Sequence, residues 1–208
     1  GLIAYGSSFD QIGVFSKTIQ DANLLIHVMS GSDKFDSTVS SEEPSNKKIK
    51  LSNKKFSFGI PEEYLNFKGL DLEIKNKLMS VIENLKKDGH KVEFLKFPFL
   101  KYLVPTYYVL TTAEASSNLA RYDGVHYGFR TKNAIDINST YENSRSEGFG
   151  IEVKRRIMLG NFVLSSGYYD AYFTKAQKVR RLIKTKTEKM LKNNDVLILP
   201  TAPSTAFN

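Results

Sequence analysis

The order of elements at residues 56–97 constrains the fold of this chain more than any other feature. FSFGIP at 56–61 is an apolar run that ends in proline and indicates a buried strand, and KVEFLKF at 91–97 alternates like a strand that faces one core. Between them, residues 71–88 predict an amphipathic helix that Gly89 terminates. Its apolar positions recur at spacings of three and four, at Ile74, Leu78, Val81, Ile82 and Leu85. This βαβ unit predicts a parallel pair of strands with a right-handed crossover.

The rest of the chain extends this unit into an α/β fold. LIAYG at 2–6 predicts a short strand, and Ser16 is the predicted N-cap of a helix over about 17–29. VLILP at 196–200 predicts a strand buried on both faces. Three further helical patterns lie at about 102–120, 151–164 and 168–192. We therefore expect a mixed, largely parallel central sheet covered by helices.

Length and composition bound the organisation of the chain. Its 208 residues fit one domain, or one domain with a small appendage, and residues 30–55, rich in Ser and with Gly and Pro, predict an exposed polar excursion. The chain starts without Met and stops soon after its last apolar run, so we expect an internal piece of a longer protein. It has no Cys, which excludes disulfides, thiolate catalysis and Cys-ligated metal sites. It also lacks a secretory signal and any apolar run near the roughly 20 residues that span a bilayer, so we expect no membrane partner and a cytoplasmic location.

A net charge of +8 raises the hypothesis of nucleic-acid binding. The basic residues cluster at KKIKLSNKK, residues 47–55, and from Lys175 to Lys192. The first cluster is most simply a solvated linker, and the second is most simply one face of a long helix. A basic nucleic-acid-binding module is therefore an alternative rather than the leading interpretation.

No catalytic constellation is visible in the chain by itself. His27, His90 and His126 do not have the spacing of a metal site, the acidic residues show no paired arrangement, and there is no phosphate-cradling motif. We expect no metal site and no cofactor in this chain.

The stretch from 144 to 180 has two interpretations. It carries glycines at 148, 150, 160 and 167 among basic and aromatic residues. Glycine is costly inside a helix, so these positions indicate turns or close approaches, as in the wall of a site or in tight helix packing.

Arg156 and Tyr107 are likewise open to two interpretations. Arg156 follows Glu152 by four residues, which fits an ion pair on a helix surface, but its guanidinium also suits the bidentate recognition of a carboxylate. Tyr107 and its neighbour Tyr108 are either core aromatics or hydroxyls that orient a small polar substrate. The spacing fits either account.

Six motifs, in one order along the chain, resemble the amidase signature family, and within it the A subunits of tRNA-dependent amidotransferases. They are SSFDQIG at 7–13, AEASSNLARYDG at 113–124, SRSEGFG at 144–150, EVKRRIMLG at 152–160, SSGYYDAY at 165–172 and PTAP at 200–203. The family usually reads DQIGP, whereas Val14 follows Gly13 here.

The resemblance implies part of a single amidase domain in a glutaminase. In such enzymes a serine nucleophile, activated by a second serine and a lysine, attacks the side-chain amide of glutamine. The released ammonia serves the kinase/transferase B subunit, which uses ATP and Mg²⁺ to amidate Glu-tRNA(Gln) or Asp-tRNA(Asn) beside the small C subunit. The catalytic signature is expected upstream of Gly1, so the chain alone is expected to be inactive.

Carried over by position, the resemblance implies that Tyr107 contacts the bound glutamine and that Arg156 holds its α-carboxylate. Asp10 and Gln11 are expected to give structural support near the signature. An amidase acting on another small amide, without a tRNA partner, remains an alternative.

Overall fold

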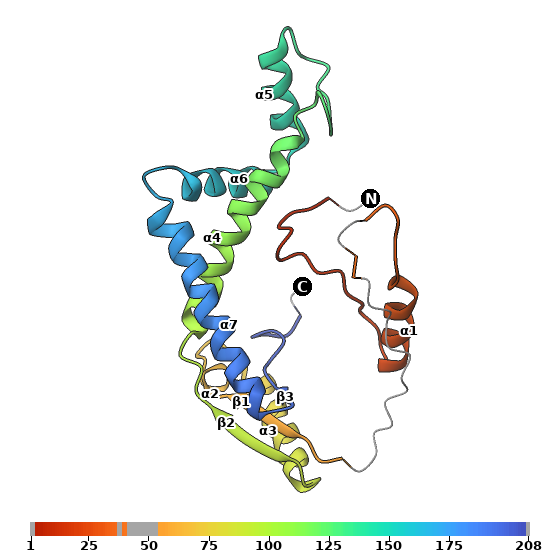
Figure 1. Cartoon of the computed structure of the whole chain (residues 1–208), viewed down its shortest axis with the longest axis vertical. Coiled ribbons are helices and arrows are strands. Elements are labelled where there is room, and N and C mark those ends of the chain that lie inside the picture. Colours follow the sequence, from red (N-terminus) through yellow and green to blue (C-terminus); the bar gives the residue numbers. More distant parts are fainter. Residues whose placement is uncertain (1–2, 37–38, 41–53, 207–208) are drawn as a thin grey trace. The chain divides into compact units, whose positions relative to one another are not determined.

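The computed structural model describes residues 3–36, 39–40 and 54–206 (Figure 1). The chain divides into two compact units. The larger unit comprises Gly1–Ser8 with Lys55–Asn208, and the smaller one comprises Phe9–Lys54. The prediction that the whole chain is part of one amidase domain stays a prediction.

The smaller unit contains one described helix, α1 (Ile19–Met29). Its N-cap is Thr18, whose side chain accepts a hydrogen bond from the Asp21 amide at 3.1 Å. The predicted cap, Ser16, is wrong because its hydroxyl donates to the Thr18 carbonyl instead. Residues 30–36, 39–40 and 54–55 are exposed and have no helix or strand. The remainder of the predicted excursion lies outside the described residues.

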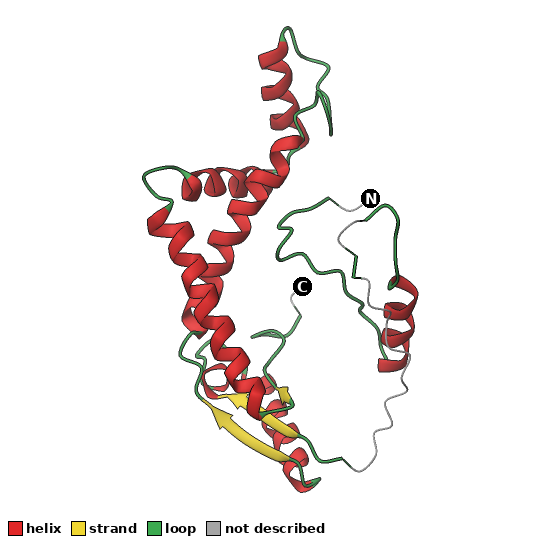
Figure 2. Cartoon of the chain, in the orientation of Figure 1, coloured by secondary structure: helices red, strands yellow, loops and turns green. Residues whose placement is uncertain are grey.

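The larger unit is built on a parallel sheet of three strands, in the order β2-β1-β3 (Figure 2). The central strand β1 (Ser57–Pro61) pairs in parallel with β2 (Lys91–Leu95) and with β3 (Val196–Leu197). Ser57 lies opposite Lys91, and Phe58 lies opposite Val196. The predicted parallel pair is therefore confirmed, and β3 adds a short third strand.

Helix α3 (Leu72–Lys87) connects β1 to β2 and covers the sheet. Asp71 caps its first turn, and Gly89 follows its end with φ +79°, as predicted. Ile82 of α3 packs with Ile60 of β1 and with Leu65 to form the core. Leu65 ends α2 (Glu62–Leu65), a single turn that the sequence did not predict.

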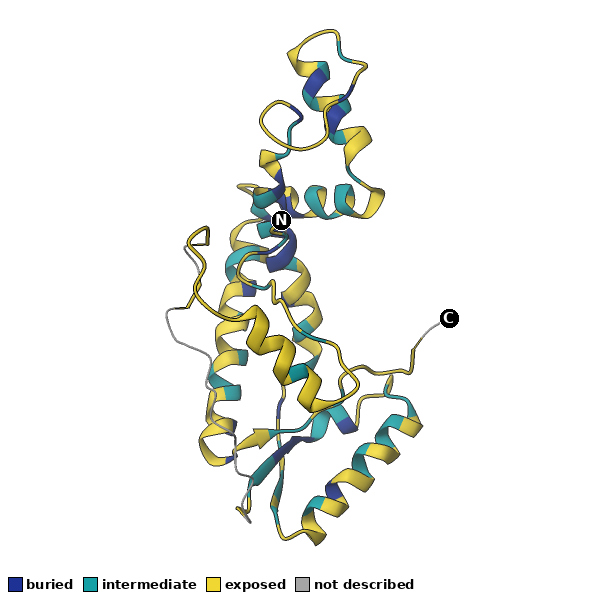
Figure 3. Cartoon of the chain, turned by 90° about the vertical axis from the view of Figure 1, so that its right-hand side faces the viewer, coloured by how far each residue is buried: buried dark blue, intermediate teal, exposed yellow. Residues whose placement is uncertain are grey.

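Besides the sheet with α2 and α3, the larger unit contains three long helices. They are α4 (Leu100–Asn118), which continues into the 3₁₀ turn η1 (Leu119–Arg121), α6 (Ile151–Leu164) and α7 (Lys175–Asn193). A π-helical turn, η2 (Asp170–Thr174), leads into α7. Dark blue marks the buried residues in Figure 3, and those of α4 run from Thr106 to Ser116.

Gly160 allows α4 and α6 to cross at backbone contact. A Cβ atom at this position would lie 2.0 Å from the Thr112 carbonyl oxygen and 2.6 Å from the Ser116 hydroxyl. At Gly150 and Gly167, by contrast, a Cβ would meet nothing within 4 Å. Close helix packing is therefore confirmed for one of the four glycines of the 144–180 stretch.

Helix α5 (Ile137–Gly148) was not predicted, because its sequence is polar and lacks an apolar repeat. Local hydrogen bonds stabilise its N-terminus, because Asp136 and Ser139 form a reciprocal capping box. Arg145 then fastens it to the end of α4 and η1 by donating to the carbonyls of Leu119 and Tyr122 at 3.0 and 2.9 Å.

The strand predicted at 2–6 is absent from its described residues, 3–6. The Tyr5 carbonyl accepts a hydrogen bond from the side-chain amide of Asn118, at 3.1 Å, instead of joining a ladder. The same amide donates to the Ser7 hydroxyl at 3.0 Å. Side chains of α4 thus take the place of a neighbouring strand.

Candidate functional site

The candidate site lies where α6 meets the segment Tyr5–Ser8. Arg156, in the second turn of α6, donates from Nη1 to the Tyr5 hydroxyl at 2.9 Å. Its guanidinium carbon lies 5.6 Å from the centre of the Tyr5 ring and 5.8 Å from that of Tyr108. Two aromatic rings at these distances stabilise the charged guanidinium and restrict its orientation.

Arg156 also forms the ion pair that its spacing predicts. Its Nε donates to Glu152 Oε1 at 2.9 Å, while the neighbouring Arg155 donates to Oε2 of the same carboxylate at 2.7 Å. The surface ion pair is therefore confirmed, although the Arg156 side chain is only 26% exposed, against 71% for Arg155. A half-buried guanidinium between aromatic rings is more constrained than a purely surface partner.

The charges of this cluster reinforce one another. The hydrogen bond from Arg156, and then that from Arg155, hold the pKa of the Glu152 carboxyl below its usual range. The Tyr5 hydroxyl and Glu152 together raise the pKa of Arg156 above its already high value. The guanidinium thus stays charged at every pH at which the protein is folded.

One edge of the guanidinium remains for a ligand. Among the described residues, the hydrogen bonds of Arg156 come from Nε and Nη1. The N–H groups of Nη2 can therefore donate to a further acceptor, and the end of the guanidinium where an Nη2–H lies parallel to an Nη1–H is the edge that suits a carboxylate.

The second predicted site residue, Tyr107, contacts Tyr108, whose ring lies between Tyr107 and Arg156 in this chain of contacts. Its ring meets that of Tyr108 edge to face, with centroids 5.6 Å apart, and Tyr108 is the ring that faces the guanidinium. Both tyrosines are 44% exposed, which excludes a fully buried core role. The structure thus adds Tyr5 and Tyr108 to the predicted pair of Tyr107 and Arg156.

Helix α4 fixes the segment that carries Tyr5. The Glu114 carboxylate accepts hydrogen bonds from both the amide and the hydroxyl of Ser8, and the amide bond measures 3.0 Å. Arg180 of α7 reaches the Ser8 hydroxyl at 3.4 Å. Asn118 also donates to Tyr5 and Ser7, so hydrogen bonds fix the position of this segment against α4.

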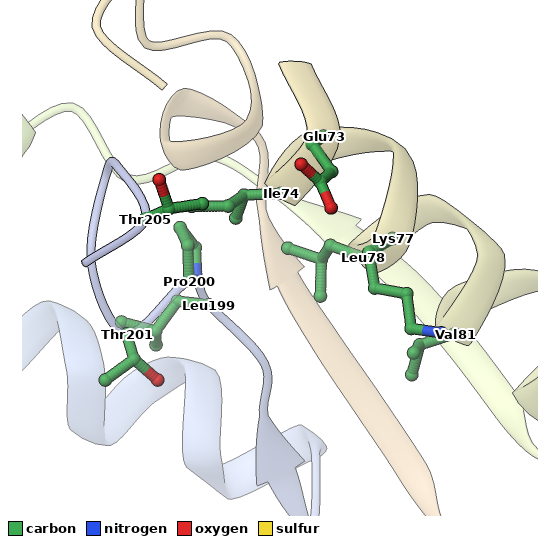
Figure 4. Close-up of a pocket in the computed structure, with 9 residues that line it drawn as sticks. All are labelled: Glu73, Ile74, Lys77, Leu78, Val81, Leu199, Pro200, Thr201 and Thr205. Carbon is green, nitrogen blue, oxygen red and sulfur yellow. The ribbon is translucent and has the colours of Figure 1, made fainter. Parts of the chain in front are cut away.

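A separate apolar groove of about 360 Å³ lies between α3 and residues 199–205 (Figure 4). Ile74, Leu78 and Leu199 line it, and the Asp71 amide donates to the Pro203 carbonyl at 2.8 Å beside it. The groove contains none of the predicted site residues.

The histidines and acidic residues form no metal centre in the described part of the chain. No three His, Asp or Glu side chains there gather closely enough to hold a metal ion. His90 is structural, since its Nδ1 accepts from the Phe56 amide at 3.1 Å, and His126 pairs with Asp123 at 2.7 Å. Among the same residues, none of the helices is long and apolar enough to cross a bilayer.

Comparison with known proteins decides the family, since the profile described as "Amidase" matches residues 1–208, the whole chain. The chain belongs to the amidase family. It is 51% identical to the A subunit of glutamyl-tRNA(Gln) amidotransferase from Halothermothrix orenii and 51% identical to that from Fusobacterium nucleatum. These alignments cover 100% of this chain but 44% and 43% of the relatives. This amidase-family chain therefore spans less than half the length of the curated relatives that it matches.

Solved structures agree with this assignment. The crystal structure of the A subunit of glutamyl-tRNA(Gln) amidotransferase from Thermotoga maritima matches with a TM-score of 0.70 and 37% identity, over 100% of this chain and 40% of that one. A second crystal structure, of an amidase, is 20% identical with a TM-score of 0.66, over 98% of this chain and 38% of that one, and supports the fold alone. The predicted fold class is confirmed.

Proposed function

We propose that this chain is part of the glutamine-hydrolysing A subunit of a tRNA-dependent amidotransferase. The observation that carries the proposal is the 51% identity, across all of this chain, to subunits of that name. Glutamine hydrolysis would supply ammonia to convert Glu-tRNA(Gln) to Gln-tRNA(Gln), or Asp-tRNA(Asn) to Asn-tRNA(Asn). The proposed partners are the transferase B subunit, which uses ATP and Mg²⁺, and the small C subunit. The proposed location of the complex is the cytoplasm.

Within this reaction, the chain supplies substrate binding rather than chemistry. The serine nucleophile attacks the amide carbon of glutamine, ammonia leaves, and water releases glutamate from the acyl-enzyme. We propose that both serines and the lysine lie upstream of Gly1. The 208-residue chain alone should then show no glutaminase turnover above a buffer blank.

Arg156 is the proposed ligand of the glutamine α-carboxylate, through its Nη2 edge, and Tyr107 is a proposed contact of the same substrate. The two aromatic rings and Glu152 support this proposal, because they fix the guanidinium before substrate arrives. A side chain that is already ordered loses less entropy when it binds.

Replacing Arg156 by Lys in the full-length enzyme, assembled with its partners, tests the proposal. Lys cannot donate two parallel hydrogen bonds, so about 1.5–3 kcal/mol of binding should be lost and the KM for glutamine should rise about 10- to 100-fold. Tyr107→Phe removes one neutral hydrogen bond of about 1 kcal/mol and should raise KM about fivefold.

Arg155→Lys is the matched control, because Arg155 pairs with the same Glu152 carboxylate but is mostly exposed. It should leave the steady-state kinetics unchanged. Equal effects at both positions would make Arg156 an ion-pair residue only. Turnover of another small amide in preference to glutamine, with no dependence on tRNA partners, would favour the alternative of a general amidase.

A further inference from the structure

We propose that the exposed face of α7 binds the phosphate backbone of RNA. Helix α7 contains eight of the chain's 30 Lys and Arg residues but one of its 22 Asp and Glu residues. The rest of the chain then holds 22 basic and 21 acidic residues, so almost the whole net charge of +8 resides on this helix. A uniform drift toward lysine would have spread the excess over the surface.

Four of these residues form a stripe along the side of α7 that faces solvent. They are Lys178, Arg181, Lys189 and Lys192, which we call the α7 stripe, and all four are exposed. Their spacings of three, eight and three residues keep them on one side of a helix. The opposite side carries Ala176 and Met190, which are buried at 4% and 6% exposure.

The α7 stripe has the length and the free charge that a polyanion requires. Lys178 and Lys192 are fourteen positions apart on the helix, which corresponds to about 21 Å, and several phosphates of one nucleic-acid strand fall within that length. In the described part of the chain, none of the four stripe residues forms an ion pair with a carboxylate; the ion pair within α7 joins Lys184 to Glu188 at 3.7 Å. The four charges are therefore available to a partner.

The chemistry of the α7 stripe favours RNA over an acidic protein surface. Protein–protein interfaces are depleted in lysine and have aromatic or apolar anchors at their centre. The stripe contains three lysines, one arginine and no aromatic residue. Leu182, an aliphatic side chain that is 53% exposed, borders the stripe, but no aromatic residue does. Lys and Arg without aromatic anchors are typical of contacts to phosphate groups, and such contacts carry no sequence information.

The test compares two variants of the full-length protein that lose equal charge. In the stripe variant, Lys178, Arg181, Lys189 and Lys192 are each changed to Gln. In the control variant, four exposed lysines elsewhere in the same unit, Lys68, Lys87, Lys96 and Lys132, are changed to Gln. Gln, Lys and Arg have similar helix propensity, and thermal unfolding followed by circular dichroism verifies that both variants fold.

Fluorescence anisotropy of a labelled tRNA(Gln) transcript measures binding across a range of salt. Four phosphate contacts correspond to a slope of about −3 in log K against log salt, or a roughly fiftyfold loss between about 50 and 200 mM. The stripe variant should lose this slope and at least about tenfold in affinity at low salt, while the control variant stays within about twofold of wild type. The single change Arg181→Gln should lower the slope by about 0.7.

Three results would overturn the proposal: no RNA binding by the wild-type protein, an equal loss in both variants, or an unchanged slope in the stripe variant. If the stripe variant keeps its RNA affinity but no longer co-purifies with other subunits, the face is a protein interface instead. None of these readouts uses glutamine turnover, so the outcome is separate from that of the proposed glutaminase function.

Discussion

Tyr5 and Arg156 are 151 positions apart in the sequence, yet the hydroxyl of one accepts a hydrogen bond from the other. The Tyr5 ring and the Tyr108 ring bracket the guanidinium, and Glu152 holds its Nε. Three different elements thus fix one cation. An arginine oriented in this way presents Nη2 as a defined edge to a ligand.

Removing only the Tyr5 hydroxyl tests how far the orientation of the Arg156 guanidinium depends on that hydroxyl. Tyr5→Phe keeps the ring but loses one hydrogen bond to a charged group, so the KM for glutamine should rise while kcat stays nearly constant. We expect a rise of about tenfold from a bond of roughly 1.5 kcal/mol. 4-Aminobutanamide, which lacks the α-carboxylate, is the control substrate, and its kcat/KM should not change. A parallel loss with both substrates would show a general effect on folding.

The Glu152 carboxyl gives a pH readout of the same cluster. Because Arg156 lowers its pKa in the folded state, the ion pair stabilises the protein above the usual carboxyl pKa and is lost as the pH falls through the lowered value. Arg156→Leu should raise the pKa of Glu152 toward the ordinary range, and Arg155→Leu should raise it less. Carbon-detected NMR titration of Glu152 measures this order directly, and the reverse order would contradict it.

These contacts show what could be predicted from the sequence at this scale. The Glu152–Arg156 pair follows from a spacing of four on one helix, which is local information. The Tyr5 contact depends on how a distant segment folds onto α4 and α6, and no local pattern marks it. Residues 2–6 instead predict a strand, because a short apolar run has the same pattern in a strand and in an irregular segment.

Among the elements, the crossing of α4 and α6 depends most on a single residue. In an exposed helix, Gly→Ala normally stabilises by about 1 kcal/mol. At Gly160, however, the new methyl group would meet the Thr112 carbonyl oxygen at 2.0 Å. Gly160→Ala should therefore reverse the usual sign and lower the free energy of unfolding by about 1–3 kcal/mol.

Chemical denaturation of Gly160→Ala and of Gly167→Ala measures this reversal. Gly167 is exposed, and a Cβ there meets nothing within 4 Å, so its variant should be neutral or slightly stabilised. If the two variants had the same stability, the helices would not cross at backbone contact.

The elements that were predicted well carry an apolar repeat of their own. The helix expected at 71–88 is observed at Leu72–Lys87, and the strand at 56–61 is observed at Ser57–Pro61. Helix α5 and the turn α2 were missed, because hydrogen bonds rather than an apolar face begin the first and the second has four residues. The helix predicted from 168 starts as a π-helical turn, a departure that apolar periodicity does not reveal.

At the scale of the whole molecule, stability should differ along the chain. Ile60 and Ile82 are 0% and 1% exposed in the core of the sheet, whereas Ile3 is 59% exposed. Hydrogen exchange of the 208-residue chain should therefore be slow at the amides of β1 and fast at Ile3 and Ala4. Equal protection at both places in a proven monomer would show that the first residues belong to the same cooperative unit.

The pairing of β1 with β3 has a consequence for synthesis on the ribosome. Phe58 and Val196 face each other in the sheet but are separated by 138 residues of chain. At about 5–20 residues per second, β1 waits roughly 7 to 28 s for this neighbour. During that interval one side of β1 exposes unpaired amide and carbonyl groups, and a nascent chain in this state is a substrate for chaperones until β3 emerges.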